Sequence, residues 1–451
     1  MTDTKLGWRF PRAFWVANGA ELFERAAYYG MFITLVVYLT DRVGFTDVQA
    51  GYLAGSFASV LYLLPTFSGI LADRIGFRRA LLLAFALLTA GYALLGASQV
   101  KSTVIVALAL VMVGGSIVKP VISGTAAKCS DENHRARAFS IFYGVVNIGA
   151  FLGKSAAAPL RIEFGLEYIN YYAALMAMLG LILVAACYRE VDRSGSDKTV
   201  RDAMRGLLAV LVNFRFLCLI VIIGGFWAIQ HQLYASMPKY ILRLLGETAR
   251  PEWLANINPL VVVILVVPIT HLIRNVRPIN AIAVSLCIIP LSALSIALSP
   301  LLQSIAGSSV NVGFGTLHPI TVMVVLGIAL QGLAECFLSP KWLEFASRQA
   351  PEGQVGLYMG YMHLSSVFAY LFGFIISGYM LDRYCPDPRT LDPTAHVQWE
   401  AFVRSAGPMP EVYMHAHYIW YVFAGIGALA LVGLLAFRSI TGEIDARRSR
   451  A

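Results

Sequence analysis

Residues 80–127 read ALLLAFALLTAGYALLGAS-QVKS-TVIVALALVMVGGSIVKPVISGTAA, two apolar runs separated by four residues. The second run carries one charged residue, Lys119. The hydrocarbon core of a bilayer is about 30 Å thick, and about 20 residues of α-helix cross it. Because only helices and closed barrels satisfy their backbone groups in lipid, continuous apolar runs of this length predict helices. The stretch therefore predicts two membrane-spanning helices joined by a short turn.

The remainder of the chain repeats this pattern. Of its 451 residues, 58% are hydrophobic and 14% are charged, whereas soluble domains have about 25% charged residues. This composition excludes a soluble multidomain enzyme, a disordered protein and a disulfide scaffold. We expect an all-α membrane protein with twelve transmembrane helices. The predicted spans are 14–40, 48–72, 80–98, 103–127, 137–160, 169–188, 216–240, 254–273, 279–299, 318–346, 356–381 and 417–437.

A charged segment divides these spans into two sets of six. We expect a six-helix bundle over residues 1–188, a cytoplasmic linker over 189–215, and a second six-helix bundle over 216–451. The second bundle includes an extended outside loop, 382–416. The linker is too short for additional membrane helices.

The positive charge follows the topology. The net charge is +9, and 22 of the 35 lysines and arginines fall in segments expected to be cytoplasmic, against 9 in outside segments. Cytoplasmic loops of membrane proteins carry such an excess. We therefore expect both termini in the cytoplasm, and we attribute the basic balance to topology rather than to nucleic-acid binding.

Six charged residues lie well inside the predicted spans, where each costs about 2.5–3.5 kcal/mol at the bilayer centre. His231 adds a titratable group to the seventh span. Two readings are open: salt bridges between helices, or the lining of a polar cavity, which we favour. The six residues are Glu21, Glu24, Arg25, Lys119, Lys154 and Glu335.

The first span carries the densest group. Glu21, Glu24, Arg25 and Tyr28 follow i, i+3, i+4, i+7 spacing and so share one helix face. Glu21 and Arg25, at i and i+4, can pair within the helix. Glu24 would then be free to form an ion pair with a residue of another span, and Lys119 is a candidate partner.

Lys119 in the fourth span and Glu335 in the tenth occupy equivalent positions if the two halves are repeats. Each precedes a proline, Pro120 and Pro340 respectively. A cavity with one positive and one negative wall suits a zwitterion. Its carboxylate would face Arg25 and Lys119, and its ammonium group would face Glu335.

The loop after the second span reads Gly69-Ile-Leu-Ala-Asp73-Arg74-Ile-Gly76-Phe-Arg78-Arg79. An Asp at a helix end, followed by a basic turn, can cap another helix and hold one conformation. Asp73 and Arg74 are therefore candidate gating residues.

Enzyme motifs find little support. Residues 149–155 resemble a phosphate-binding loop, but Ile148 stands where the motif needs its first glycine. The sequence has no GxSxG, HExxH or CxxC motif. We expect neither enzyme activity, nor a cofactor, nor a metal site.

The loop Gly69–Arg79 resembles the GxxxDRxGxRR loop of the major facilitator superfamily. Residues 21–30, ELFERAAYYG, resemble the ExxERFxYYG stretch of the proton-dependent oligopeptide transporter family within it. Further matches to that family run in order along both halves: Tyr62-Leu-x-x-Pro65, Lys119-Pro120, Phe142-Tyr143 with Asn147-x-Gly149, Phe226-Trp227-Ala228, Asn258-Pro259-Leu260 and Glu335-x-x-Leu-Ser-Pro340.

The resemblance implies the major facilitator fold, in a bacterial-type inner membrane, and import of di- and tripeptides or related compounds with protons by alternating access. We expect a monomer. In this family a helix 1 Arg, a helix 4 Lys and a helix 5 Asn face the peptide carboxylate, a helix 8 Asn and a helix 10 Glu face its amino end, and tyrosines line the walls. Carried over, these are Arg25, Lys119, Asn147, Asn258 and Glu335, with Tyr29 and Tyr62.

Two departures affect the expected proton coupling. Phe32 stands where the family usually has a second Arg on helix 1, and His231 stands where it has a Glu on helix 7. The proton would then be carried by Glu21, Glu24 or His231. The alternatives are a facilitator-fold carrier or exporter of another small zwitterion or anion, with altered or no proton coupling, a non-transporting receptor, and an intramembrane enzyme.

Overall fold

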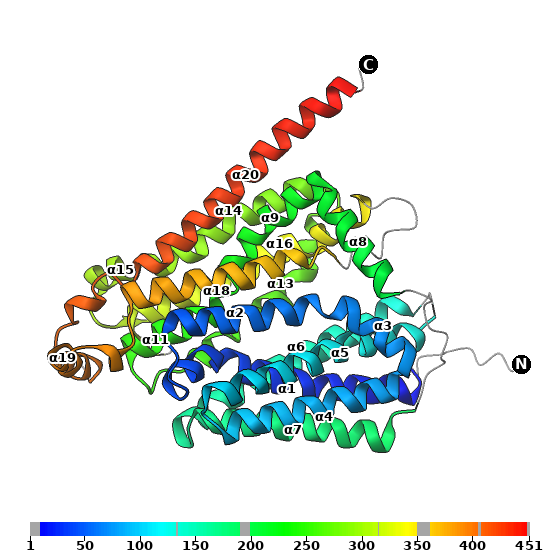
Figure 1. Cartoon of the computed structure of the whole chain (residues 1–451). Coiled ribbons are helices and arrows are strands. Elements are labelled where there is room, and N and C mark those ends of the chain that lie inside the picture. The colour runs from blue at the N-terminus through cyan, green and yellow to red at the C-terminus, as the bar shows by residue number, and fades with distance from the viewer. Residues whose placement is uncertain are drawn as a thin grey trace, which may run out of the picture. The chain divides into compact units, whose positions relative to one another are not determined.

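The computed structural model describes residues 10–131, 134–189, 199–313, 315–349, 361–404 and 407–448. The chain is built almost entirely of helices (Figure 1). In chain order the elements are α1 (Arg12–Asp41), α2 (Asp47–Leu63), α3 (Pro65–Ile75), α4 (Phe77–Ala97), α5 (Lys101–Lys128), α6 (Arg135–Glu163), α7 (Leu166–Cys187), α8 (Val200–Val212), α9 (Phe214–Gln230), α10 (Gln232–Ala235), α11 (Met237–Leu245), α12 (Pro251–Leu254), α13 (Ile257–Leu272), α14 (Pro278–Ala297), α15 (Ser299–Ala306), β1 (Val310–Asn311), β2 (Thr316–Leu317), α16 (Pro319–Gln349), α18 (Leu364–Tyr384), α19 (Pro393–Val403) and α20 (Tyr418–Arg448), with two short 3₁₀ turns, Pro388–Thr390 and Glu411–Tyr413.

The expected all-α membrane fold is confirmed. Within the described residues, eleven helical segments are long and apolar enough to cross a membrane, and the bent pair α2 and α3 makes a twelfth if it is counted as one span. The predicted spans coincide with these helices, because an apolar run long enough to cross a bilayer determines where in the sequence its helix lies. The first residues of the eleventh predicted span, 356–360, lie outside the described residues.

The structure interrupts two spans that the sequence predicts as continuous. The second span bends by 49° where α2 ends and α3 begins at Pro65, because a proline lacks the N–H that would continue the helix. The seventh span breaks at His231 and again at Ser236, so that α9, α10 and α11 follow one another.

Two predicted loops contain helices of their own. The described part of the linker includes α8, while residues 190–198 of the linker lie outside the described residues. The outside loop 382–416 contains α19, whose N-cap Asp392 accepts hydrogen bonds from the amides of Thr394 and Ala395, both 3.0 Å long. Such a cap satisfies amides at the start of a helix.

Contacts divide the chain into two compact units. The first comprises Met1–Phe45 and Val60–Arg205, and the second comprises Thr46–Ser59 and Gly206–Ala451. The start of α2 therefore groups with the second unit. The sequence-based boundaries at 188 and 216 stay a prediction about the two helical bundles.

The first unit is organised around α1. This helix packs against α6 and α7, and α4 packs against α5 and α7 (Figure 1). A Cβ at Gly149 of α6 would lie 2.7 Å from the Cβ of Arg25, and one at Gly153 would overlap the carbonyl oxygen of Ala26. The segment that resembles a phosphate loop is therefore a small-xxx-small contact, which lets two helix backbones approach closely.

In the second unit α14 packs against α16 and α20, and α9 packs against α18 and α20. The start of α2 packs against α18, because a Cβ at Gly51 would lie 2.5 Å from the carbonyl oxygen of Phe374. Ser59 Oγ donates to the carbonyl of Val367 over 2.8 Å. β1 and β2 form a two-stranded antiparallel hairpin with Val310 opposite Leu317.

Candidate functional site

The charged face of α1 forms a compact cluster within the first unit. Arg25 Nε lies 3.3 Å from Glu21 Oε1, and it also donates to Glu24 Oε2. The side chains of Glu21 and Glu24 are each 1% exposed, and that of Arg25 is 13% exposed. We call these three residues the Arg25 cluster. The expected Glu21–Arg25 contact is present, but Glu24 contacts Arg25 instead of remaining free for Lys119.

Two further cations lie beside tyrosine rings of the same unit. The ring centroid of Tyr29 is 5.9 Å from Arg25 Cζ and 5.8 Å from Lys154 Nζ. Lys119 Nζ lies 5.5 Å from the ring centroid of Tyr62. These are cation–π distances. Lys154 is buried and Lys119 is exposed, so only Lys119 is open to the surroundings of the helices.

The glycines of α6 explain why Lys154 is close to α1. Gly153 brings the backbone of α6 against that of α1, and Lys154 is the next residue. About two turns earlier on α6, Asn147 is half-buried and its amide donates to the carbonyl of Tyr143 over 2.8 Å. The first unit thus gathers the predicted residues Glu21, Glu24, Arg25 and Tyr29, together with Lys154.

Glu335 lies in the second unit, on α16, and its partner comes from α9. Gln230 Nε2 donates to Glu335 Oε2 over 2.9 Å. Gln230 is buried and Glu335 is half-buried. Asn258, near the start of α13, is half-buried, and α13 packs against α16.

His231 directly follows Gln230, at the break in the seventh span. Its imidazole stacks on the ring of Tyr370, with centroids 3.5 Å apart and planes 8° apart, and it also lies 5.7 Å from the ring of Trp227. The residue is 5% exposed, and its Nδ1 has no hydrogen-bond partner among the described residues.

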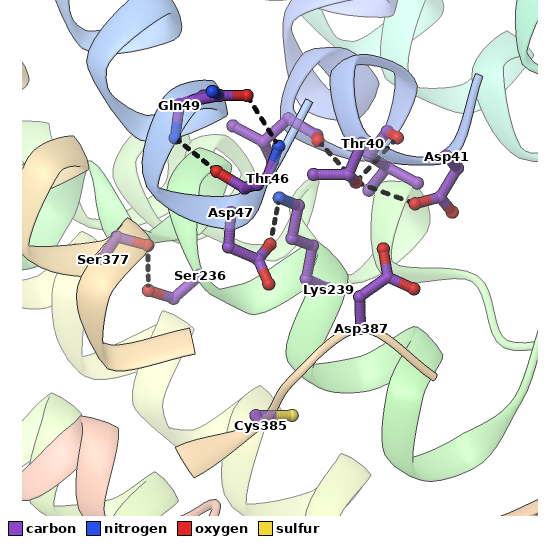
Figure 2. A network of polar contacts seen from close by, with 12 residues as sticks. Thr40, Asp41, Thr46, Asp47, Gln49, Ser236, Lys239, Ser377, Cys385 and Asp387 are labelled. Carbon is purple, nitrogen blue, oxygen red and sulfur yellow. Dashed lines mark hydrogen bonds and ion pairs between the residues drawn. The ribbon is translucent and has the colours of Figure 1, made fainter. Parts of the chain in front are cut away.

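A third charged cluster was missed by sequence reasoning (Figure 2). Asp47 at the start of α2 accepts from Lys239 Nζ over 2.7 Å and from the two terminal nitrogens of Arg243 over 2.9 Å each. The side chains of Asp47, Lys239 and Arg243 are 2%, 3% and 6% exposed. Asp387 lies 3.9 Å from Arg243. We call these four residues the Asp47 cluster.

The loop 382–416, which is predicted to lie outside, is tied to this cluster. Arg243 Nη1 donates to the carbonyl of Cys385 over 2.5 Å, and Trp399 Nε1 donates to the carbonyl of Arg243 over 2.8 Å. Tyr413 Oη donates to the carbonyl of Pro386 over 2.9 Å. The loop is therefore held at both ends and through α19.

Electrostatics stabilise the charged forms in this cluster. Burial acts to lower the pKa of Arg243, but the charge of Asp47 outweighs it and raises that pKa above its usual range. Burial likewise acts to raise the pKa of Asp387, but hydrogen bonds from Arg389 and the charge of Arg243 hold that pKa below its usual range. An opposite charge at such short range favours the ionised form.

Only a weak sequence signal was available for this cluster. Lys239 and Arg243 stand at i and i+4, which places them on one helix face. Lys239 falls at the end of the predicted seventh span and Arg243 just beyond it, so neither stood out as a charge deep in the membrane. Nothing local pairs them with Asp47, which lies 192 residues before Lys239.

The predicted gating residues lie at the end of α3. Asp73 is half-buried, Arg74 is exposed, and Gly76 ends the helix with a φ of 89°. The capping contact comes from Arg78, whose guanidinium donates to the carbonyls of Tyr188 over 3.1 Å and Ala185 over 2.8 Å. A cation at the C-terminus of α7 is favourable because the helix dipole is negative there.

The part of the chain that the structure describes has no group of side chains that would bind a metal ion. No three His, Cys, Asp or Glu side chains of that part gather where they would hold an ion. The charged clusters consist instead of acids paired with lysine, arginine or glutamine.

The fold and these clusters define a multi-pass helical membrane protein with charged side chains buried inside its spans. The family model described as Major Facilitator Superfamily matches residues 20–316, about two thirds of the chain. The chain belongs to the major facilitator superfamily.

The resemblance to proton-dependent oligopeptide transporters is also confirmed. Over 240 residues the chain is 28% identical to "Dipeptide and tripeptide permease B" of Yersinia enterocolitica, covering 52% of this chain and 48% of that one. Over 216 residues it is 31% identical to the Salmonella typhimurium protein of the same name, covering 46% and 44%. The chain spans about half the length of the curated relatives it matches.

Solved structures share the fold along nearly the whole chain. One is titled "Crystal structure of peptide transporter POT in complex with sulfate"; it has a TM-score of 0.73 at 21% identity, covering 96% of this chain and 95% of that one. Another is titled "Structural insights into substrate recognition in proton dependent oligopeptide transporters", with a TM-score of 0.67 at 19% identity, covering 95% and 99%.

Proposed function

We propose that this chain is a secondary active transporter, not an enzyme, that imports di- and tripeptides or peptide-like zwitterions together with protons by alternating access. The Arg25 cluster carries the proposal. It places two acids and a base in a buried membrane span, where charges are expensive and usually mark a transport pathway. The similarity to permeases named for dipeptides and tripeptides supports the substrate class.

Each unit supplies one end of the proposed recognition. In the first unit Arg25, Lys119 and Asn147 bind the substrate carboxylate, because they present cations and an amide donor. In the second unit Asn258 and Glu335 bind the amino end. The rings of Tyr29 and Tyr62 form the proposed aromatic walls of the substrate site, and each ring lies beside a cation.

The acids of the Arg25 cluster are the proposed proton carriers. Glu21 and Glu24 share one arginine, so a proton on either acid weakens its hold on Arg25 and frees the guanidinium for a substrate carboxylate. Glu21 Oε2 has no hydrogen-bond partner among the described residues, which leaves it an acceptor for that proton. His231 is a second candidate, although its imidazole faces the rings of Tyr370 and Trp227 rather than a carboxylate.

The proposed topology places both termini and the linker in the cytoplasm of an inner membrane, and the loop 382–416 outside. Asp73 and Arg74 would act as gating residues on the cytoplasmic side, and the monomer would be the transporting unit. Cysteines introduced at the exposed positions Thr390 and Thr199 test the topology. A membrane-impermeant maleimide should label Thr390→Cys in intact cells and Thr199→Cys only after permeabilisation; the reverse pattern would invert the topology.

Transport in proteoliposomes tests the function itself. The purified protein should accumulate labelled dipeptides when an inward proton gradient is imposed, and unlabelled dipeptide should drive counterflow. Glu335→Gln should weaken substrates with a free amino end more than N-acetylated analogues, while Lys119→Ala should weaken substrates with a free carboxylate more than their amides. Equal loss of both ligand types in folded variants would contradict the assignment of the two ends.

The departures at Phe32 and His231 favour one second candidate. A carrier or exporter of another small zwitterion or anion would use the same charged clusters with altered or no proton coupling. Counterflow without response to the proton gradient would support this candidate. Absence of any dipeptide binding or counterflow would refute the peptide proposal.

A further inference from the structure

Two buried glutamines of the second unit are neighbours of Glu335: Gln230 contacts its carboxylate, and Gln331 lies four residues before it on α16. Gln230 and Gln331 are 6% and 2% exposed, and the Oε1 atom of each has no hydrogen-bond partner among the described residues. Nearly all buried polar atoms in folded proteins are hydrogen-bonded, so each exception requires an explanation. A buried acceptor without a partner costs the desolvation free energy of that group, which exceeds the net free energy that a typical hydrogen bond provides.

The geometry at Gln230 fixes which of its atoms is the acceptor. Its amide faces Glu335 Oε2 at 2.9 Å. A carboxylate only accepts hydrogen bonds, so the amide nitrogen must be the atom that faces Glu335. The other end of the amide is therefore the oxygen, and this oxygen is the orphaned atom.

Gln331 stands one helical turn before Glu335 on α16, and the i, i+4 spacing puts both side chains on one face. The start of α13 lies against this turn, because a Cβ at Gly332 would lie 3.1 Å from the carbonyl oxygen of Asn258. Asn258 Nδ2 also has no hydrogen-bond partner within the part of the chain that the structure describes. One unpaired acceptor thus belongs to the amide that contacts Glu335, and a second, on Gln331, lies one helical turn away on the same helix face.

We propose that Gln230 and Gln331, with Glu335, form a binding site specific for a primary ammonium group. An ammonium group carries three N–H donors, and these three side chains offer a carboxylate and two amide oxygens. This inference rests on the proposed function, because it specifies which amino ends the transporter accepts. The two oxygens are closed off from solvent in this conformation, so they gain their partners only when the substrate enters and the side chains adjust.

The test separates the charge of the amino end from its hydrogen bonds. Dialanine and its N,N,N-trimethylammonium analogue carry the same charge, but the analogue has no N–H donors. Binding of both compounds is measured on purified full-length protein, and transport of both in proteoliposomes. The wild type should prefer dialanine. Gln230→Met and Gln331→Met should each reduce that preference about tenfold, the change that one hydrogen bond to a charged group gives.

Gln232 provides a matched control. It is also fully buried, but its amide donates to the carbonyl of Ala228 over 2.8 Å and accepts from Ser236 over 2.7 Å. Gln232→Met should lower thermal stability and leave the preference unchanged. Gln331→Met removes an orphaned oxygen, so it should leave the stability of the ligand-free protein equal or higher while binding of the amine weakens.

The outcomes distinguish the two proposals. If the wild type transports dialanine and both methionine variants keep the full preference, the ammonium site is wrong and the transport function stands. If Gln331→Met loses stability as Gln232→Met does, with the preference unchanged, Gln331 is structural. If the wild type neither binds nor transports dialanine, both proposals fail together.

Discussion

Asp47→Asn should be among the most destabilising conservative changes in the chain. The substitution keeps the shape of the side chain and removes its charge. Lys239 and Arg243, which are 3% and 6% exposed, would then remain buried without the carboxylate that both of them contact. Breaking a buried ion pair by removing one partner typically costs about 3–5 kcal/mol, because an uncompensated charge stays buried. We expect a loss of that size in the free energy of unfolding.

The measurement is reversible unfolding of the purified protein in lipid bicelles, followed by circular dichroism during denaturant titration. Asp382→Asn is the matched control, because Asp382 is exposed on α18 close to the same cluster. Surface substitutions of this kind usually change stability by no more than about 0.5 kcal/mol. The two variants therefore separate the effect of a buried charge from that of any aspartate in this region.

A double-mutant cycle tests the physical cause. Adding Lys239→Met to Asp47→Asn removes one of the two buried cations whose shared carboxylate the first change neutralises, so the double variant should recover part of the lost stability. Contacting residues show such non-additivity, and distant ones do not. If Asp47→Asn is as stable as Asp382→Asn, or if Lys239→Met only adds to the loss, the interpretation of the cluster as a mutually dependent ionic network is wrong.

Three other predictions follow from the same structure. Burial acts to raise the pKa of Asp387, but hydrogen bonds from Arg389 and the charge of Arg243 hold that pKa below its usual range, so the carboxylate stabilises the fold above its unfolded pKa of about 4 and loses that contribution as pH falls further. The difference in unfolding free energy between wild type and Asp387→Asn should therefore be constant near neutral pH and disappear in acid. A difference that grows in acid would contradict this sign. Gly153→Leu should lower the free energy of unfolding by about 1–3 kcal/mol by separating α6 from α1, whereas Gly144→Leu on the same helix, where no atom lies within 4 Å, should not. Glu24→Gln should abolish proton-driven accumulation and leave counterflow, so continued accumulation by this variant would exclude Glu24 as the proton carrier.

The fold was predictable from the sequence because membrane helices are specified locally. An apolar run of the right length can satisfy its backbone only as a helix. The interruptions were not predictable to the same degree. Pro65 gives a local reason for the bend between α2 and α3. The break of the seventh span at His231 has no such local cause, and this break brings Gln230 to the end of α9 beside Glu335.

The site was predictable only where partners share one helix. The i, i+4 rule gives the contact between Glu21 and Arg25. The contact between the adjacent residues Glu24 and Arg25 departs from that rule, because adjacent side chains leave a helix in different directions and only long, flexible chains can meet. The Asp47 cluster depends on contacts between segments far apart in the chain, which periodicity does not encode.

The buried polar groups of the second unit fall into two kinds, and the difference indicates their roles. In the Asp47 cluster both carboxylate oxygens of Asp47 accept hydrogen bonds, so the burial cost is offset within the protein itself. On Gln230, which contacts Glu335, and on Gln331, one helical turn before it, a buried amide oxygen has no partner among the described residues. A fully hydrogen-bonded network stabilises one structure, whereas a buried acceptor without a partner gains free energy when a hydrogen-bond donor reaches it. On this reasoning the paired acids and bases of the Asp47 cluster hold the loop 382–416 in place, and the orphaned oxygens of Gln230 and Gln331 are the atoms at which we propose that a substrate donor completes the hydrogen bonding.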